Sequence, residues 1–247
     1  MEETTVLSAA EAVEYGEFKR TRREAEIALT LNKLVLDASR RETDKHTLKN
    51  TCDSAKKLKA ASVLVSPVNV TSARRQLQGC DTQVACLVGG TGESLIATKR
   101  TEARRAMRQG AKEIHLVLCY SALAGGNLAY LKREIKRVRK AVKRCAFLVS
   151  LEDHALGEED IALGVRAACE SKADGVCVRG ETQLLVRAMH TGRGKIRADA
   201  SGVENAEQLR LLLNAGAARA ATSDGERIAE ELYRTVSSES FTPLHNA

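Results

Sequence analysis

Short apolar runs alternate with longer amphipathic segments from Leu34 onward. A strand-then-helix alternation of this kind is typical of a parallel sheet covered by helices. The eight predicted strands, each followed by a helix-like segment, cover residues 34–37, 62–66, 83–88, 113–118, 146–152, 174–178, 195–199 and 218–222. Residues 1–30 form an additional N-terminal segment of helical character.

Eight strand–helix units in a chain of 247 residues match a closed (βα)8 barrel, which needs about 250 residues. We therefore predict an α/β fold, a single (βα)8 TIM barrel over residues 31–247 with an extra N-terminal helical segment over residues 1–30 packed on it. An open, doubly wound sheet is the alternative fold.

The most basic stretch follows the fourth predicted strand, in LKREIKRVRKAVKR (131–144). Leu131, Ile135, Val138 and Val142 form one apolar stripe at helical spacing, and eight of the ten other positions are Lys or Arg. Two further basic clusters are Lys19, Arg20, Arg22 and Arg23, and Lys99, Arg100, Arg104, Arg105 and Arg108. Such runs on helices are usually solvated surface. The functional alternative is a docking face for an acidic partner.

The formal net charge of +7 favours acidic partners in general, without selecting among them. Lys136, Arg139 and Lys143 are three or four residues apart and should lie along one strip of the helix. We expect this strip to bind an acidic protein surface. An aromatic content of 3% without Trp disfavours base stacking, so nucleic-acid binding ranks behind protein binding.

The seven cysteines are scattered and show no C-x-x-C spacing, which indicates reduced thiols in a cytoplasmic protein. The acidic start lacks the apolar stretch of a secretory signal, and no apolar run is long enough to span a bilayer. We expect a cytoplasmic protein that does not bind membranes and holds no metal or cofactor.

Several motifs follow one another along the chain: LVLDAS (34–39), VSPVNV (65–70), TKRTEARRAMRQGAKEIHLVL (98–118), ADGVCVRG (173–180) and ASGVENAEQLRLLLNAGAARAATSDG (200–225). In order and spacing they resemble the deoxyribose-phosphate aldolase family, over most of the chain. The resemblance implies a TIM barrel and a class I lyase that cleaves 2-deoxyribose 5-phosphate through a lysine Schiff base.

The lysines that this reaction needs are replaced by other residues. The Schiff-base lysine of the family corresponds to Cys177, and only a primary amine forms the protonated imine. The second family lysine corresponds to Ala198, and the acid/base Asp of strand four to His115. Arg197 cannot substitute, because a guanidinium is no nucleophile. Lys195 would face inward only if its strand were displaced by two residues.

The phosphate end of the barrel has also changed. TIM barrels bind phosphate through the loops after strands seven and eight. Ser201, Gly202 and Ser223 remain where the resemblance places this site. The three carboxylates expected beside them are Glu181, Glu204 and Asp224. Because each repels a dianion, we expect weak or no binding of sugar phosphates.

We therefore expect a catalytically silent pseudoenzyme that binds or regulates an acidic protein, with actin or an actin-binding protein as a specific candidate by analogy. The alternative is a residual or altered aldolase or lyase that acts on a small aldehyde or sugar phosphate. The polar residues on or just past predicted strand ends are Asp37, His115, Cys119, Glu152, Asp153, His154, Cys177 and Asp199. Cys177 with His115 could form a thiol–base pair, or with a carboxylate a metal site. We expect vestigial packing instead.

Overall fold

Eight parallel strands close into a barrel in the computed structural model, which describes residues 9–238 of the chain. Each strand pairs with the next one along the chain, and β8 completes the ring by pairing with β1. The strands are β1 (Leu34–Ala38), β2 (Ser62–Val65), β3 (Gln83–Val88), β4 (Glu113–Val117), β5 (Ala146–Leu151), β6 (Gly175–Arg179), β7 (Arg197–Ser201) and β8 (Ala220–Thr222). The closed ring confirms the predicted (βα)8 barrel and excludes the doubly wound sheet.

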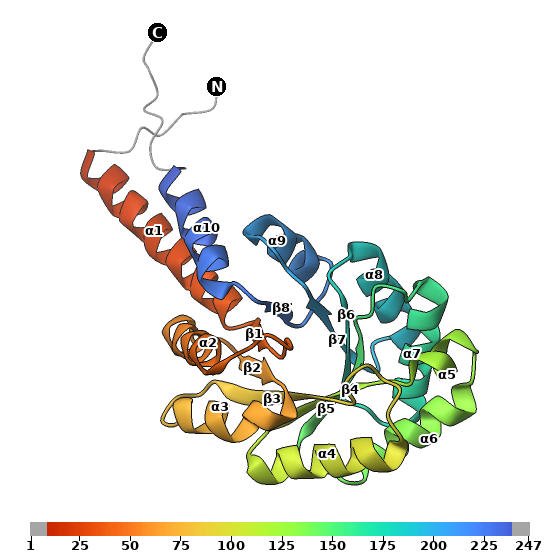
Figure 1. Ribbon diagram of the computed structural model, residues 1–247. Helices are drawn as coiled ribbons and strands as arrows, with labels where there is room; N and C mark the ends of the chain where they lie inside the picture. Colours follow the sequence, from red (N-terminus) through yellow and green to blue (C-terminus); the bar gives the residue numbers. More distant parts are fainter. Residues whose placement is uncertain (1–8, 239–247) are drawn as a thin grey trace, which may run out of the picture.

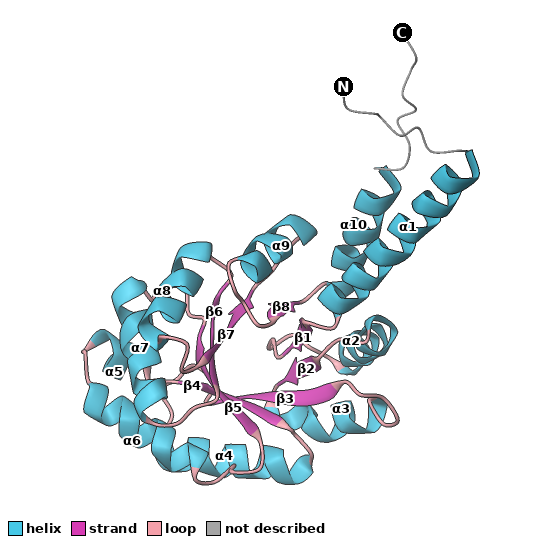
Figure 2. Cartoon of the chain, turned by 180° about the vertical axis from the view of Figure 1, so that it is seen from behind, coloured by secondary structure: helices cyan, strands magenta, loops and turns pink. Residues whose placement is uncertain are grey.

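Helices follow the strands and cover the outside of the ring (Figures 1 and 2). They are α2 (Lys45–Leu58), η1 (Pro67–Asn69), α3 (Val70–Gln76), α4 (Ile96–Gln109), α5 (Tyr120–Ala124), α6 (Leu128–Arg139), α7 (Glu158–Glu170), α8 (Thr182–Gly192) and α9 (Ala206–Asn214). Among the described residues, no helix is long and apolar enough to cross a membrane.

The N-terminal helix α1 (Ala9–Leu31) lies beside the C-terminal helix α10 (Gly225–Ser238), and both project from one side of the barrel (Figure 1). The end of α1 joins the core through Ile27 and Leu31, which are buried. The segment predicted over residues 1–30 therefore contains a helix, although residues 1–8 lie outside the described part of the chain. The division of the chain at residue 31 stays a prediction.

Two packing layers lie on the two faces of the barrel sheet, because successive residues of a strand point to opposite faces. The layer between sheet and helices is apolar and includes Val176 and Ala198. Inside the ring, an apolar cluster is formed by residues of β8, β1, β2 and β3. Its buried residues are Val35, Leu64, Ala85 and Ala221. The other half of the ring, from β4 to β7, carries polar side chains and contains the candidate site.

A buried ion pair joins α4 to α6. Lys99 and Glu134 are both completely buried, and the Lys99 ammonium contacts the Glu134 carboxylate. The same ammonium donates to the carbonyl oxygens of Gly92 (2.5 Å) and Val117 (3.0 Å). Our prediction that Lys99 belongs to a surface cluster is therefore wrong, because the ion pair satisfies a charge that the sequence pattern assigns to solvent.

Candidate active site

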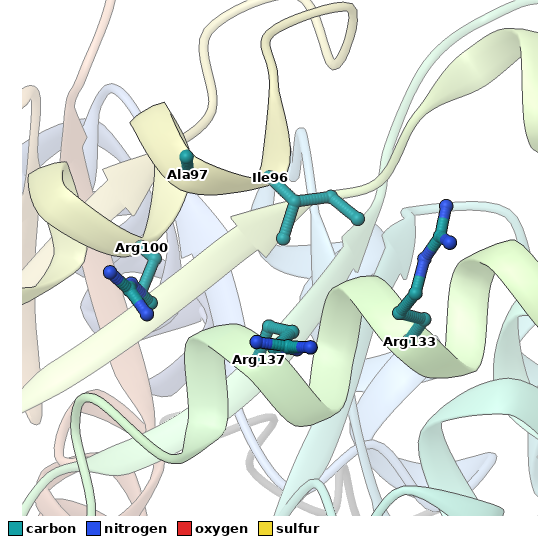
Figure 3. Close-up of a pocket in the computed structure, with 5 residues that line it drawn as sticks. All are labelled: Ile96, Ala97, Arg100, Arg133 and Arg137. Atoms are coloured by element: carbon teal, nitrogen blue, oxygen red, sulfur yellow. The ribbon is translucent and has the colours of Figure 1, made fainter.

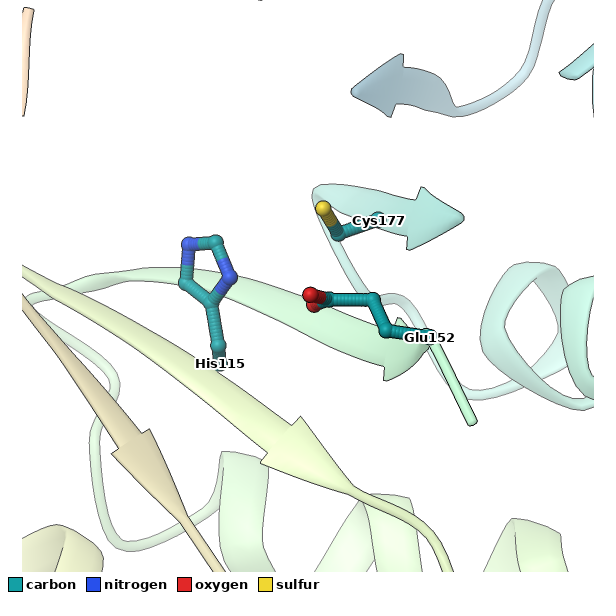
Figure 4. A group of neighbouring side chains, drawn as sticks. All are labelled: His115, Glu152 and Cys177. Carbon is teal, nitrogen blue, oxygen red and sulfur yellow. The ribbon is translucent and has the colours of Figure 1, made fainter. Parts of the chain in front are cut away.

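Three side chains from neighbouring strands meet inside the barrel (Figure 4). His115 lies on β4 and Cys177 on β6, and each is 2% exposed; Glu152 directly follows β5. One nitrogen, one sulfur and one carboxylate oxygen from these residues all lie within 4.8 Å of one another. Active sites of TIM barrels lie at the carboxyl ends of the strands. We therefore take this group as the centre of the candidate site.

A charged network lies closer to the amino ends of the strands. Glu113, the first residue of β4, pairs with Arg219 at 2.5 Å and with Arg197 at 3.3 Å. Asp199 on β7 pairs with the same two arginines, at 2.9 Å and 3.0 Å respectively. The two carboxylates are almost completely buried. Because two anions face two cations, the charges of this network compensate one another.

His115 connects the network to the candidate site. Its Nε2 atom lies 2.6 Å from a carboxylate oxygen of Glu113. Burial alone would raise the pKa of Glu113, but the hydrogen bond and charge of His115 and the charge of Arg219 hold that pKa well below its ordinary value. The ionised Glu113 therefore accepts the Nε2 proton. The opposite nitrogen, Nδ1, is buried and has no hydrogen-bond partner among the described residues.

Cys177 faces the interior as a protonated thiol. Burial, followed by the charges of Glu152 and Asp199, raises the pKa of Cys177 well above its ordinary value. The hydroxyl group of Ser150 lies 2.8 Å from a Glu152 oxygen and orients that carboxylate. A neutral thiol is a poor nucleophile, so the acid–base groups of the site are His115 and Glu152.

The residue that faces the interior beside Cys177 is Asp199, its direct partner in the β6–β7 register. Ala198 instead packs in the layer between sheet and helices. The predicted position of the second lysine is therefore off by one residue, because the register pairs Ala198 with Val176 and Asp199 with Cys177. Burial raises the pKa of the Cys169 thiol on α7, and the nearby charge of Lys195 partly offsets this rise. Lys195 thus lies on the helix side.

The loops after β6 and β8 pair their carboxylates with arginines. Glu181 lies 2.5 Å from Arg179, and Asp224 lies 3.6 Å from Arg227. Arg227 also donates to the backbone carbonyl oxygen of Glu204. The sequence pattern identified the three carboxylates but not their cationic neighbours. Their repulsion of a phosphate is therefore weaker than their number implies.

The three residues expected to remain from a phosphate site differ in exposure. Ser201 is buried and its hydroxyl lies 3.3 Å from the carbonyl oxygen of Val178. Gly202 and Ser223 are exposed, and Gly202 has a φ of +70°. Of the three, only the last two are open to a ligand. Weak binding of sugar phosphates stays a prediction.

The predicted docking strip is not one continuous helix face. α6 ends at Arg139, so Lys143 lies in the turn that follows. Arg139 pairs with Asp174 at 3.1 Å and lies over the ring of Phe147. Lys136 alone of the predicted three is an exposed residue of the helix. Our expectation of a single strip is therefore corrected.

Other cations of α6 line two shallow hollows. One lies between α4 and α6 (Figure 3) and is lined by Ile96, Ala97, Arg100, Arg133 and Arg137. The second runs along α6 and is lined by Ala129, Lys132, Arg133, Lys136, Arg137 and Lys140. Arg133 and Arg137 therefore border both hollows.

The closed ring and the polar group at its strand ends define a barrel of the aldolase type. The family model described as DeoC/LacD family aldolase matches residues 33–199. The deoxyribose-phosphate aldolase of Thermoanaerobacter sp. (strain X514) is 33% identical over 200 residues, covering 76% of this chain and 89% of that protein. The chain belongs to the DeoC/LacD aldolase family.

One further relative and one solved structure match a similar or larger share of the chain. The deoxyribose-phosphate aldolase of Caldicellulosiruptor saccharolyticus is 30% identical over 219 residues, covering 83% of this chain and 98% of that protein. The deoxyribose phosphate aldolase structure from Aeropyrum pernix superimposes with a TM-score of 0.77 at 17% identity, covering 93% of this chain and all of that one. At this identity the structure supports the fold alone.

Proposed function

We propose that this chain is an altered aldolase or lyase that acts on a small aldehyde or sugar phosphate without a lysine Schiff base. One observation supports this most directly. At the centre of an aldolase-family barrel, Cys177 and Asp199 are register partners. His115 in the middle of β4 and Glu152 directly after β5 lie close to Cys177. The groups for proton transfer are present, whereas a thiol and a carboxylate stand where an imine would need amines.

His115 is suited to proton transfer because its two nitrogens have different surroundings. Nε2 is held by the ionised Glu113, so a proton taken up at Nδ1 creates an imidazolium beside a carboxylate. Glu152 contributes a second proton acceptor within 4.8 Å. The reaction supported by these groups is removal of a proton next to a carbonyl group.

Deuterium exchange tests this proposal with a small aldehyde alone, so the identity of any further substrate need not be known. Acetaldehyde is incubated in D2O with the full chain, and loss of the methyl proton signal is followed by NMR. We expect faster exchange than in buffer, and a decrease of about 100-fold or more in His115→Gln and Glu152→Gln. Asp153→Asn, in the exposed loop next to Glu152, is the control and should exchange like the wild type.

Exchange at the buffer rate, together with no cleavage of 2-deoxyribose 5-phosphate, would contradict the proposal. Activity that survives in both His115→Gln and Glu152→Gln would also exclude these groups as the proton acceptors.

The second candidate is a binding or regulatory barrel whose basic surface docks an acidic protein. The observation that favours it is the pair of hollows bordered by Arg133 and Arg137. A cationic groove attracts an acidic surface and speeds its encounter. Actin, or a protein that binds actin, remains the specific candidate.

Co-sedimentation with actin filaments tests this candidate. We expect the wild type to sediment with filaments at low ionic strength and less so at high ionic strength. The double variant Arg133→Glu with Arg137→Glu should no longer sediment with filaments at low ionic strength, and its melting temperature should be that of the wild type. Arg104→Glu with Arg108→Glu is the matched control, because both arginines are exposed on α4 at the same spacing. Equal sedimentation of the two double variants would refute the α6 surface as the docking face.

A further inference from the structure

We infer that His115, Glu152 and Cys177 bind a divalent zinc ion inside the mouth of the barrel. Binding itself is independent of the activity proposed above, whereas the catalytic use of the ion rests on that proposed function. From the sequence we expected no metal, because the cysteines show no C-x-x-C spacing and vestigial packing was favoured over a metal site at Cys177. Two ligands lie on β4 and β6 and the third directly follows β5, so no local spacing could reveal such a site.

The donor atoms already lie close together. They are within 4.8 Å of one another, and the three side chains point toward a common space (Figure 4). Ligand atoms on a tetrahedral zinc ion lie about 3.3–3.8 Å apart, given bonds of about 2.0–2.3 Å. The required movement is about 1 Å, which rotation of the longest side chain, Glu152, can provide.

His115 supplies an independent observation. The residue is 2% exposed, and its Nδ1 atom is buried without a partner among the described residues. A buried nitrogen without a hydrogen bond is costly. The Glu113 carboxylate that lies 2.6 Å from Nε2 is paired with Arg197 and Arg219. This carboxylate accepts the Nε2 proton, so the lone pair of Nδ1 is free to bind a cation. A carboxylate behind a histidine that binds a metal through its other nitrogen is the usual support for a zinc ligand.

The ligand set favours zinc over other common cations. A nitrogen, a sulfur and a carboxylate oxygen suit zinc, whereas magnesium and calcium prefer oxygen alone. A cation at this position would replace the proton of the Cys177 thiol, since a thiolate is the form that binds metal. Ser150 orients Glu152 through a hydrogen bond of 2.8 Å. The ligands thus have supporting contacts in the absence of the ion.

Three protein ligands leave the fourth position of a tetrahedral zinc ion open, as in catalytic zinc sites. A zinc ion polarises a carbonyl oxygen, which is the electron-withdrawing role that an imine has in Schiff-base chemistry. His115 Nδ1 cannot bind the ion and accept a proton at the same time. With zinc bound, His115 would act as a ligand. The role of proton acceptor would then fall to another group, located at the open coordination position of the ion.

Cobalt titration of the metal-free full chain tests the site, because Co²⁺ replaces Zn²⁺ and its spectrum reports the ligands. We expect one equivalent to bind with a thiolate-to-cobalt charge-transfer band, and zinc to displace it. Cys177→Ser should lose that band, and His115→Gln and Glu152→Gln should each weaken binding at least about tenfold. Cys119→Ser is the matched control, because Cys119 is a half-buried thiol near a different carboxylate, Glu93 (3.7 Å).

X-ray absorption on the zinc-loaded wild type provides a test that no variant can confound by misfolding. We expect one sulfur at about 2.3 Å and nitrogen or oxygen at about 2.0–2.1 Å. Two or more sulfurs, none, or failure to bind cobalt would overturn the site. Cobalt binding without proton exchange would leave the site and refute the proposed activity. If the chain binds no cobalt and proton exchange persists after chelation, the proposed activity would stand and the zinc site would be refuted.

Discussion

Cys177 on β6 and Asp199 on β7 are direct partners in the register of two neighbouring strands, and both are 2% exposed. The thiol therefore stands next to a carboxylate that is itself paired with Arg219 and Arg197. Imine chemistry needs an unprotonated amine at such a position and a cationic neighbour that lowers its pKa. This pair provides neither.

Borohydride should trap no adduct at the candidate site. Incubation with acetaldehyde or 2-deoxyribose 5-phosphate and then borohydride should add no mass beyond the alkylation of exposed lysines that any protein shows, because no lysine belongs to the charged network of the interior among the described residues. Mass spectrometry of the intact chain gives the answer. An adduct assigned to Lys195 would show that β7 can shift its register, and would contradict the acid–base mechanism.

Restoring a lysine should work better when Asp199 is neutralised. In Cys177→Lys the adjacent Asp199 carboxylate raises the pKa of the new amine and keeps it protonated. Cys177→Lys with Asp199→Asn should therefore trap more aldehyde near neutral pH than Cys177→Lys alone. Cys177→Lys with Ala198→Lys is the comparison, and it should mainly lose stability because Ala198 is packed beneath the helices. Equal trapping in the first two variants would contradict this electrostatic argument.

Removal of Arg219 should destabilise the fold strongly. Arg219→Met takes one cation from two buried carboxylates, Glu113 and Asp199, and should lower the free energy of unfolding by about 3–5 kcal/mol. Arg166→Met is the control, since its ion pair with Glu170 is largely exposed and should contribute at most about 1 kcal/mol. Urea unfolding measures both. Similar losses would mean that the interior network is solvated.

Alkaline pH should reduce the stability that Cys177 provides. Its pKa is raised in the folded chain by burial and by Glu152 and Asp199, so the unfolded thiol, with a pKa of about 8.5, loses its proton first. The contribution is complete below that pH and is lost as the pH rises toward the folded pKa. The stability difference between wild type and Cys177→Ala should shrink by about 1.4 kcal/mol per pH unit above about 8.5. A constant difference in urea unfolding would contradict the raised pKa.

The repeating pattern of the chain was sufficient to predict the barrel, since eight apolar runs at regular spacing leave few other ways to bury them. The sequence placed β3 at residues 83–88, as in the structure. β7 was placed two residues early because Lys195 and Arg197 gave no signal for where the loop ends. A shift of two residues leaves each side chain on the same face of a strand. The placement of the lysine position at Ala198 is therefore a separate error of one residue, because the interior partner of Cys177 is Asp199.

Buried charges could not be found from the pattern, because burial of a charge depends on a partner distant in the chain. Lys99 and Glu134 are 35 residues apart, and Arg219 and Glu113 are 106 residues apart. Considered alone, each of these four charged residues has the side chain of a typical surface residue. His115 and Cys177 were identified through the family motifs, but their approach to Glu152 depends on the pairing of β4, β5 and β6 as neighbours in the sheet.

The network of Glu113, Asp199, Arg197 and Arg219 has an evolutionary consequence. A single change of Asp199 to lysine would place a third cation against two arginines and leave only Glu113 to balance them. We expect this substitution alone to lower the stability of the fold, so selection on stability opposes it unless a second change restores the balance of charge. The interior thus couples its substitutions: a new amine inside the barrel needs a matching change elsewhere in the same network.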